Sequence, residues 1–67
     1  MSAILNIKGF ELKLDNSEQL TPQGKVIRCA GIERNGQTTI YFFRVIGTND
    51  FIKFEFDYND KFLKTIV

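Results

Sequence analysis

The fold of this chain is decided by the stretch from Thr38 to Tyr58, which reads TTIYFFRVIGTNDFIKFEFDY. The stretch contains seven of the nine aromatic residues of the sequence. Its second half alternates strictly, with Ile52, Phe54, Phe56 and Tyr58 on one side of an extended chain and Lys53, Glu55 and Asp57 on the other. A period of two residues is typical of a β-strand that buries one face. The pattern therefore predicts that a small all-β domain is built around this stretch.

The first half of the stretch differs, because residues 40–43 are apolar on both sides of the strand. We expect this strand to be covered on both faces. Asn35 and Gly36 come shortly before it, and this pair is a strong signal for a two-residue hairpin turn, since both residues tolerate a positive φ. The predicted hairpin places Arg34 opposite Gln37, and a bulge at Gly31 would shift the pairs beyond it.

The turn between the two halves of the stretch allows two registers. A two-residue loop at Asn49 and Asp50 sets Arg44 opposite Glu55, whereas a four-residue loop sets it opposite Lys53. We favour the shorter loop, because opposite charges attract across neighbouring strands. The two registers differ by two residues and so keep the same faces. In either register the predicted core consists of Tyr41, Phe43, Val45, Ile52, Phe54 and Phe56.

The flanking segments extend this sheet. We expect strands over residues 2–14, 25–34, 38–46, 51–58 and 61–67, and a surface loop over 15–24. The parity of the apolar residues changes at Gly9, which we interpret as a β-bulge in the first strand. Consecutive strands joined by tight turns predict one domain over residues 1–67, an antiparallel meander of about five strands. Such a meander either curls, in the limit into a small barrel, or stacks on a second copy.

The register of the last strand stays open. A two-residue loop before it would bring Leu63, Thr65 and Val67 to the core, and a three-residue loop would bring Phe62 and Ile66. In the first alternative Lys64 lies opposite Glu55.

Composition argues against catalysis. The chain has no histidine and a single cysteine, Cys29, so it offers neither an activated nucleophile nor a set of nitrogen and sulfur metal ligands. Cys29 is best interpreted as a small core residue, and Glu55 and Asp57 as a solvated strand face. We therefore expect no enzyme, no catalytic or metal-binding residue and no cofactor.

Length and charge bear on the partners. With 67 residues a single core supplies only a few kcal/mol of net stability, so self-association is an obvious further source. The net charge of +1 argues against nonspecific attraction to nucleic acid or anionic membrane. The N-terminus lacks the pattern of a signal peptide, and no segment has the roughly 20 apolar residues that span a bilayer. We expect a cytoplasmic protein of a bacterium, a phage or a similar host, with no membrane partner.

A second apolar stripe lies on the side of the central strands that points away from the predicted core. The interface candidates are Ile40, Phe42, Arg44 and Ile46, with Ile27 and Cys29 across from them. Exposed stripes of this kind mark interfaces. We expect a binding module that acts through protein contacts, either by self-association or as a regulator or inhibitor that docks on a larger protein.

The alternative is a small β-barrel that binds single-stranded nucleic acid. Phe42 could stack on a base, while Arg28, Arg44 and Lys53 could contact phosphates. The carboxylates on the same strand face would repel phosphate, which makes this the second hypothesis.

Overall fold

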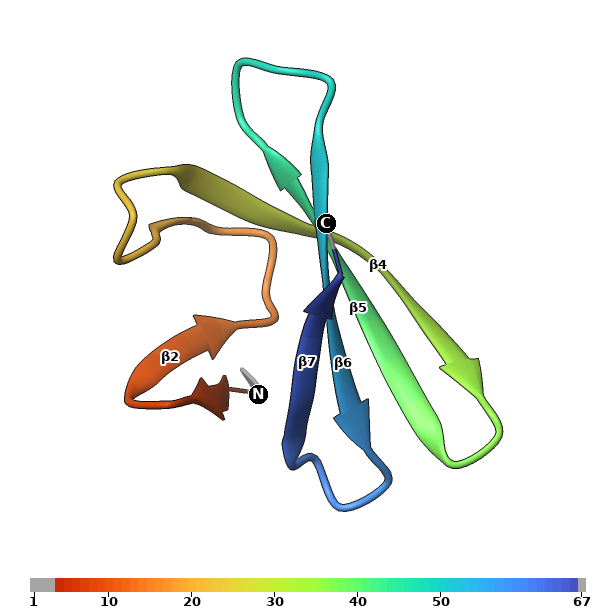
Figure 1. The fold of residues 1–67 in the computed structure, drawn as a ribbon. Coiled ribbons are helices and arrows are strands. Elements are labelled where there is room, and N and C mark those ends of the chain that lie inside the picture. Colours follow the sequence, from red (N-terminus) through yellow and green to blue (C-terminus); the bar gives the residue numbers. More distant parts are fainter. Residues whose placement is uncertain (1–3, 67) are drawn as a thin grey trace.

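The computed structural model describes residues 4–66, which form seven β-strands and no helix. The strands are β1 (Ile4–Ile7), β2 (Phe10–Lys13), β3 (Glu18–Leu20), β4 (Val26–Asn35), β5 (Thr38–Val45), β6 (Phe51–Asp57) and β7 (Phe62–Ile66). Strands β1 and β2 form a two-stranded sheet, and β3 to β7 form a strongly twisted five-stranded sheet in chain order (Figure 1). All neighbouring strands are antiparallel. The predicted small all-β domain with a five-stranded antiparallel meander is confirmed, and over the described residues the sheets do not close into a barrel.

The N-terminal segment is a hairpin and not one bulged strand. Lys8 and Gly9 form its two-residue turn with φ values of 48° and 88°, as a type I′ turn requires. The predicted β-bulge at Gly9 is therefore wrong. The change of apolar parity has another cause: a two-residue turn places Leu5 opposite Leu12, so that both side chains point to the same face. Both are buried in the core.

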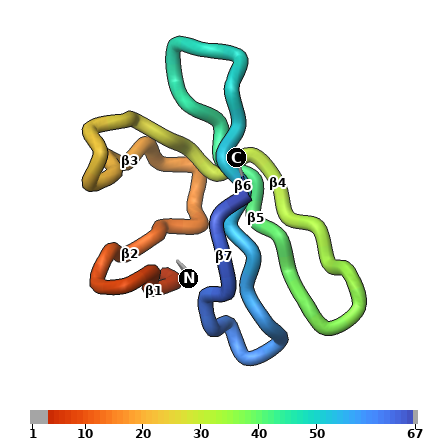
Figure 2. The backbone as a smooth tube through the Cα atoms, in the orientation of Figure 1, coloured from red at the N-terminus to blue at the C-terminus, as the bar shows by residue number. Residues whose placement is uncertain are grey.

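The segment expected to be only a surface loop contains the short strand β3. It pairs with the first half of β4, with Gln19 opposite Ile27 and Leu20 opposite Val26. Strand β3 therefore takes the edge position that the sequence assigned to the first strand. Figure 2 follows the backbone from the N-terminal hairpin through β3 into the meander.

The β4–β5 hairpin turns one residue later than predicted. Asn35 pairs with Thr38, and Gly36, with a φ of 65°, occupies the first position of the two-residue turn. Glycine at that position is typical of a type II′ turn. The predicted pairing of Arg34 with Gln37 is wrong by two residues, because Arg34 lies opposite Thr39. A shift of two keeps the faces near the turn unchanged.

A β-bulge in β4 does change the faces. Cys29 lies opposite Phe43 and Gly31 lies opposite Phe42, so Ala30 is the extra residue. An extra residue reverses the side to which all residues beyond it point. Ile27 and Cys29 therefore join the core face, and the prediction that they lie across from the second apolar stripe is wrong.

The β5–β6 loop has four residues, 46–49, as many as the longer predicted alternative, but it begins one residue earlier. The N–H of Val45 donates to the carbonyl of Asp50 at 3.0 Å, and Arg44 lies opposite Phe51, not opposite Glu55 or Lys53. Thr48 stabilises the loop, because its hydroxyl donates to the Val45 carbonyl at 2.9 Å and accepts from the Asp50 N–H at 3.1 Å. The observed register differs from both predictions by an even number of residues, so the predicted faces are retained.

The last hairpin combines both predicted alternatives. Its loop has three residues, since the Asp57 N–H donates to the Lys61 carbonyl at 2.9 Å, and Phe62 packs against the core as that loop implies. A register shift between Glu55 and Phe56 then restores the pairing of Glu55 with Lys64 that the two-residue loop implied. Of the other residues proposed for the core here, Leu63 and Thr65 are exposed, Ile66 is half-buried and Val67 lies outside the described residues.

The core lies between the N-terminal hairpin and one face of the five-stranded sheet. It consists of Leu5, Leu12, Ile27, Tyr41, Phe43, Val45, Phe54 and Phe56. Aromatic rings meet edge to face in it, with centroids 5.3 Å apart for Tyr41 and Phe56 and 5.6 Å apart for Phe43 and Phe54, a favoured geometry. The predicted core is thus confirmed, except that Ile52 is only partly buried.

Candidate functional site

The candidate site is the face of the five-stranded sheet that points away from the core, which we call the outer face. Side chains alternate between the two faces of a sheet. The outward-pointing residues, from β3 to β6, are Glu18, Leu20, Val26, Arg28, Gly31, Glu33, Asn35, Thr38, Ile40, Phe42, Arg44, Phe51, Lys53, Glu55 and Asp57. The N-terminal hairpin packs on the opposite face. Within residues 4–66 no strand covers the outer face.

Three of the four interface candidates lie on the outer face. Ile40 and Phe42 are half-buried, and Arg44 is exposed. The ammonium group of Lys53 lies 5.4 Å from the centroid of the Phe42 ring, within the range of a cation–π contact. The fourth candidate, Ile46, is a half-buried turn residue after β5 whose N–H donates to the Val26 carbonyl at 2.9 Å. The four residues therefore lie on β5 and at the start of the turn that follows it.

The largest exposed apolar side chains of the outer face were not among these candidates. Leu20, Val26 and Phe51 have 63%, 38% and 48% of their surface exposed. Leu20 was missed because its segment was interpreted as a loop, and Val26 because the predicted register of β4 contained no bulge. Phe51 could have been found, since the alternation of β6 already placed it opposite in parity to the core residues.

Charge is distributed unevenly along the strands of the outer face. Arg28 and Arg44 lie directly opposite each other, and Lys53 is in the next row of the sheet. Toward the β4–β5 turn follow Glu33 and Glu55, which lie on either side of Ile40. The outer face therefore has a cationic end at Arg28 and Arg44 and an acidic end at Glu33 and Glu55, with Phe42 between them. The exposed side chains of Leu20, Val26 and Phe51 lie at the cationic end, where Glu18 is opposite Arg28.

The two arginines have no acidic side chain in ion-pair distance. In the described part of the chain the one ion pair within 4.0 Å joins Lys64 to Glu55, at 3.7 Å. Like charges on directly opposite strand positions are destabilising. Glu18 lies opposite Arg28 on β3 but not within ion-pair distance, and both arginines are exposed, so they are accessible to solvent ions or to an acidic partner.

The remaining reactive group lies on the other face. Cys29 is half-buried, and burial raises the pKa of its thiol above the ordinary value of 9.0, although a hydrogen bond with Gly31 opposes this. A raised pKa reduces the fraction of thiolate, the nucleophilic form. Residues 4–66 contain no group of three or more acidic or cysteine side chains placed to hold a metal ion. Nor does the described chain contain a helix that is long and apolar enough to cross a membrane.

Comparisons with protein-family models, with curated protein sequences and with solved structures found no match.

Proposed function

We propose that this protein is a non-catalytic binding module that acts through protein contacts of its outer face, and that its simplest partner is a second copy of the same chain. The observation that carries the proposal is a sheet face with exposed apolar side chains beside the basic pair Arg28 and Arg44, and with Glu33 and Glu55 toward its other end. Leu20, Val26 and Phe51 are exposed there. Apolar patches bordered by charged residues are typical of interfaces between proteins.

The charge pattern is self-complementary. In a symmetric dimer the same surface of both copies meets, and the contact of residue i with residue j occurs twice. A two-fold axis that crosses the strands at Phe42 would place the cationic end of one copy over the acidic end of the other. Arg28 of each copy would then face Glu33 of its partner, and the apolar side chains around Phe42 would meet at the centre.

The accessible surface of the chain is large for its mass, which favours the burial of more surface in an interface. The chain exposes 4767 Å², compared with roughly 4,400 Å² for a typical folded monomer of its mass. Small domains often gain stability from oligomerisation. A standard interface buries about 800 Å² per partner, and the outer face of β3 to β7 is the surface that would supply it.

A charge-reversal experiment tests this arrangement. Arg28→Glu and Glu33→Arg should each weaken self-association, because each variant dimer would contain two like-charged contacts. An equimolar mixture of the two variants should associate again, because both contacts of the mixed dimer then join opposite charges. Restoration in the mixture, measured by sedimentation velocity, supports the proposal. Unchanged dimers of the single variants, or a mixture that stays monomeric, would contradict it.

A second candidate function is the binding of single-stranded nucleic acid. It is favoured by one observation, the pairing of Arg28 with Arg44 beside the exposed ring of Phe51. Aromatic side chains on a sheet can stack on bases while basic residues contact phosphates. The salt dependence of binding distinguishes the two functions. Binding to phosphates weakens steeply as the salt concentration rises, whereas an apolar interface is retained. A labelled oligothymidylate that binds at low salt, is released at moderate salt and is lost on Arg44→Glu would favour this candidate.

A further inference from the structure

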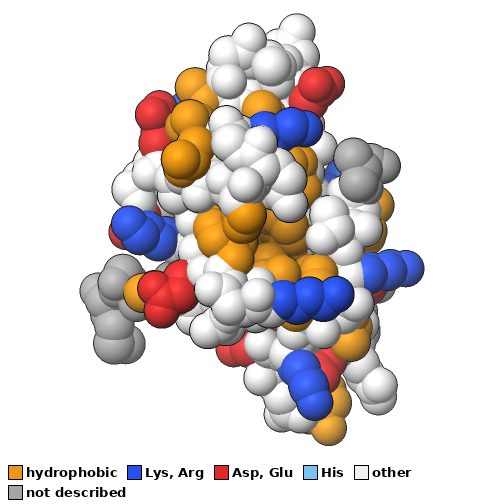
Figure 3. Space-filling view, turned by 60° about the vertical axis from the view of Figure 1, so that its left-hand side comes forward, with side chains coloured by type: hydrophobic (Ala, Val, Ile, Leu, Met, Phe, Trp, Pro, Cys, Tyr) orange, Lys and Arg blue, Asp and Glu red, His pale blue; other side chains and the backbone are white. Residues whose placement is uncertain are grey.

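A cavity lies on the other side of the sheet from the outer face. Its volume is about 420 Å³, and it is formed where the N-terminal hairpin, the β3–β4 loop and strands β6 and β7 meet. Figure 3 shows apolar side chains gathered in a hollow of this side of the molecule, with basic side chains next to it. Pockets for small organic ligands have volumes of roughly 300–1,000 Å³. The cavity is therefore large enough for a ligand of that kind.

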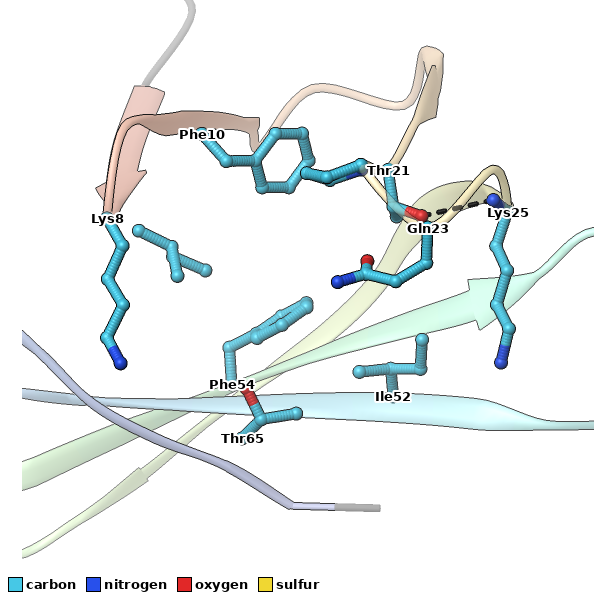
Figure 4. A pocket seen from close by; sticks show the side chains of 10 residues that line it. Lys8, Phe10, Thr21, Gln23, Lys25, Ile52, Phe54 and Thr65 are labelled. Atoms are coloured by element: carbon cyan, nitrogen blue, oxygen red, sulfur yellow. Dashed lines mark hydrogen bonds between the residues drawn. The ribbon is translucent and has the colours of Figure 1, made fainter.

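The lining of the cavity is apolar inside and basic at its edges. Ile7, Phe10, Ile52 and Phe54 supply apolar surface. In Figure 4 the side chains of Lys8 and Lys25 lie at opposite sides of the cavity. The side chain of Gln23 extends over the ring of Phe54, and Thr65 lies beside it.

The charged residues that line the cavity, Lys8 and Lys25, are both basic. Among its lining residues there is no aspartate or glutamate. Within the described part of the chain neither Lys8 nor Lys25 has a carboxylate within 4.0 Å. Two ammonium groups without a neutralising partner next to an apolar surface match a ligand that combines an anionic group with an apolar body.

The β3–β4 loop, which forms one wall of the cavity, is held in place by backbone hydrogen bonds and by the Thr21 hydroxyl. Thr21 and Lys25 close the β3–β4 loop, because the Thr21 N–H donates to the Lys25 carbonyl at 2.8 Å and the Lys25 N–H donates to the Thr21 hydroxyl at 3.0 Å. The Gly24 N–H donates to the Thr21 carbonyl at 2.9 Å. Lys8 is fixed in the tight turn between β1 and β2. A preformed site loses less conformational entropy when a ligand binds.

We infer that this cavity binds a small organic carboxylate with a hydrocarbon body, such as a medium-chain fatty acid. The hydrocarbon lies on Phe54 and Ile52, and the carboxylate pairs with Lys8 or Lys25 at the edge. This site uses the core side of β6 and β7, so it is separate from the contacts of the outer face and does not depend on the proposed function.

Decanoate and decanol provide the test, because they share a ten-carbon chain and differ in charge. Both are titrated into the ¹⁵N-labelled protein below the concentration at which decanoate forms micelles. Decanoate should shift the amide signals of Gln23, Lys25 and Thr65 and bind at least ten times more tightly than decanol. Equal affinities, no binding of decanoate, or shifts confined to the outer face would overturn the inference.

Variants of Lys8 and Lys25 test whether these residues bind the carboxylate. In the Lys8→Gln, Lys25→Gln double variant the affinity for decanoate should fall to that for decanol, which should itself stay unchanged. Each single variant shows which edge holds the carboxylate. The matched control is Lys13→Gln, Lys61→Gln, which removes two exposed lysines outside the cavity. Wild-type affinity for decanoate in the first double variant, with its thermal unfolding unchanged, would contradict the inference.

A third variant tests the cavity itself. Thr65 is exposed at its edge, so Thr65→Trp should fill the space without removing a core side chain. Both ligands should then lose affinity at least tenfold. If decanoate binds this variant as tightly as the wild type, it is held outside the cavity and the inference is wrong.

Discussion

The side-chain amide of Gln19 forms two hydrogen bonds with the backbone of Lys13. The Lys13 N–H donates to Oε1 of Gln19 at 3.2 Å, and Nε2 of Gln19 donates to the Lys13 carbonyl at 3.0 Å. This reciprocal pair has the pattern of a backbone ladder, although it joins a residue of β2 to a residue of β3. It thus links the two-stranded sheet to the five-stranded sheet, which otherwise meet through the packing of apolar side chains.

Removal of this amide should therefore destabilise the fold. A hydrogen bond contributes about 0.5–1.5 kcal/mol to net stability, so Gln19→Ala should lower the free energy of unfolding by about 1–3 kcal/mol. Gln19→Glu keeps the acceptor for the Lys13 N–H but loses the donor, and should give a smaller loss at neutral pH. Urea unfolding measures both, with Gln37→Ala in the exposed β4–β5 turn as the control. Equal stability of Gln19→Ala and the control would show that the link is not needed.

The two faces of the sheet should respond differently to the loss of a phenylalanine. Phe56 is fully buried, and its ring centroid lies 5.3 Å from that of Tyr41 and 5.6 Å from that of Phe62. Phe56→Ala should cost about 3–5 kcal/mol, enough to unfold much of a domain this small. Phe51→Ala on the outer face should cost about 1 kcal/mol or less when measured on the monomer. A cooperatively folded Phe56→Ala variant with nearly wild-type stability would contradict the assignment of the core.

Stability should fall at alkaline pH. Burial raises the pKa of Tyr41 above its ordinary value of 10.0, with a further contribution from Asp60, and burial also raises the pKa of Cys29 above 9.0. Both groups are therefore more easily deprotonated in the unfolded chain. Their contribution to stability is complete below these ordinary values and is lost as the pH rises through the raised ones.

Chemical unfolding at a series of pH values between about 8 and 11 checks this expectation. The free energy of unfolding should decrease with pH, and Tyr41→Phe should reduce the slope above pH 10. Cys29→Ala should reduce the slope at the lower end of this pH range. If neither variant changes the slope, the loss of stability at alkaline pH is caused by other groups.

The sequence predicted faces better than registers, for a physical reason. Alternation in Phe54 and Phe56 depends only on the period of a strand, so the core was found even though neither predicted register between β5 and β6 was right. The loop is set by hydrogen bonds of the Thr48 hydroxyl, which residue types alone do not specify. Gly9 was compatible with a bulge or a turn, since both accept a positive φ.

The candidate site was predicted in part for the same reason. Ile40, Phe42 and Arg44 share a parity, and the structure places them together on the outer face. Leu20 was missed because its segment was interpreted as a loop, and Val26 because the parity of β4 changes along the strand. The bulge at Ala30 turns Val26 outward; the neighbouring Gly31 indicates that a bulge is possible but does not determine whether one forms.

The central claim is self-association through the outer face, and sedimentation equilibrium at several protein concentrations in moderate salt tests it most directly. The wild-type mass should rise with concentration from the chain mass of 7.8 kDa toward twice that value. Phe42→Asp and Ile46→Asp should stay at the chain mass while remaining folded, and Tyr58→Asp, which replaces an exposed aromatic residue outside the outer face, should associate like the wild type. A wild-type mass of 7.8 kDa at every concentration would contradict the claim.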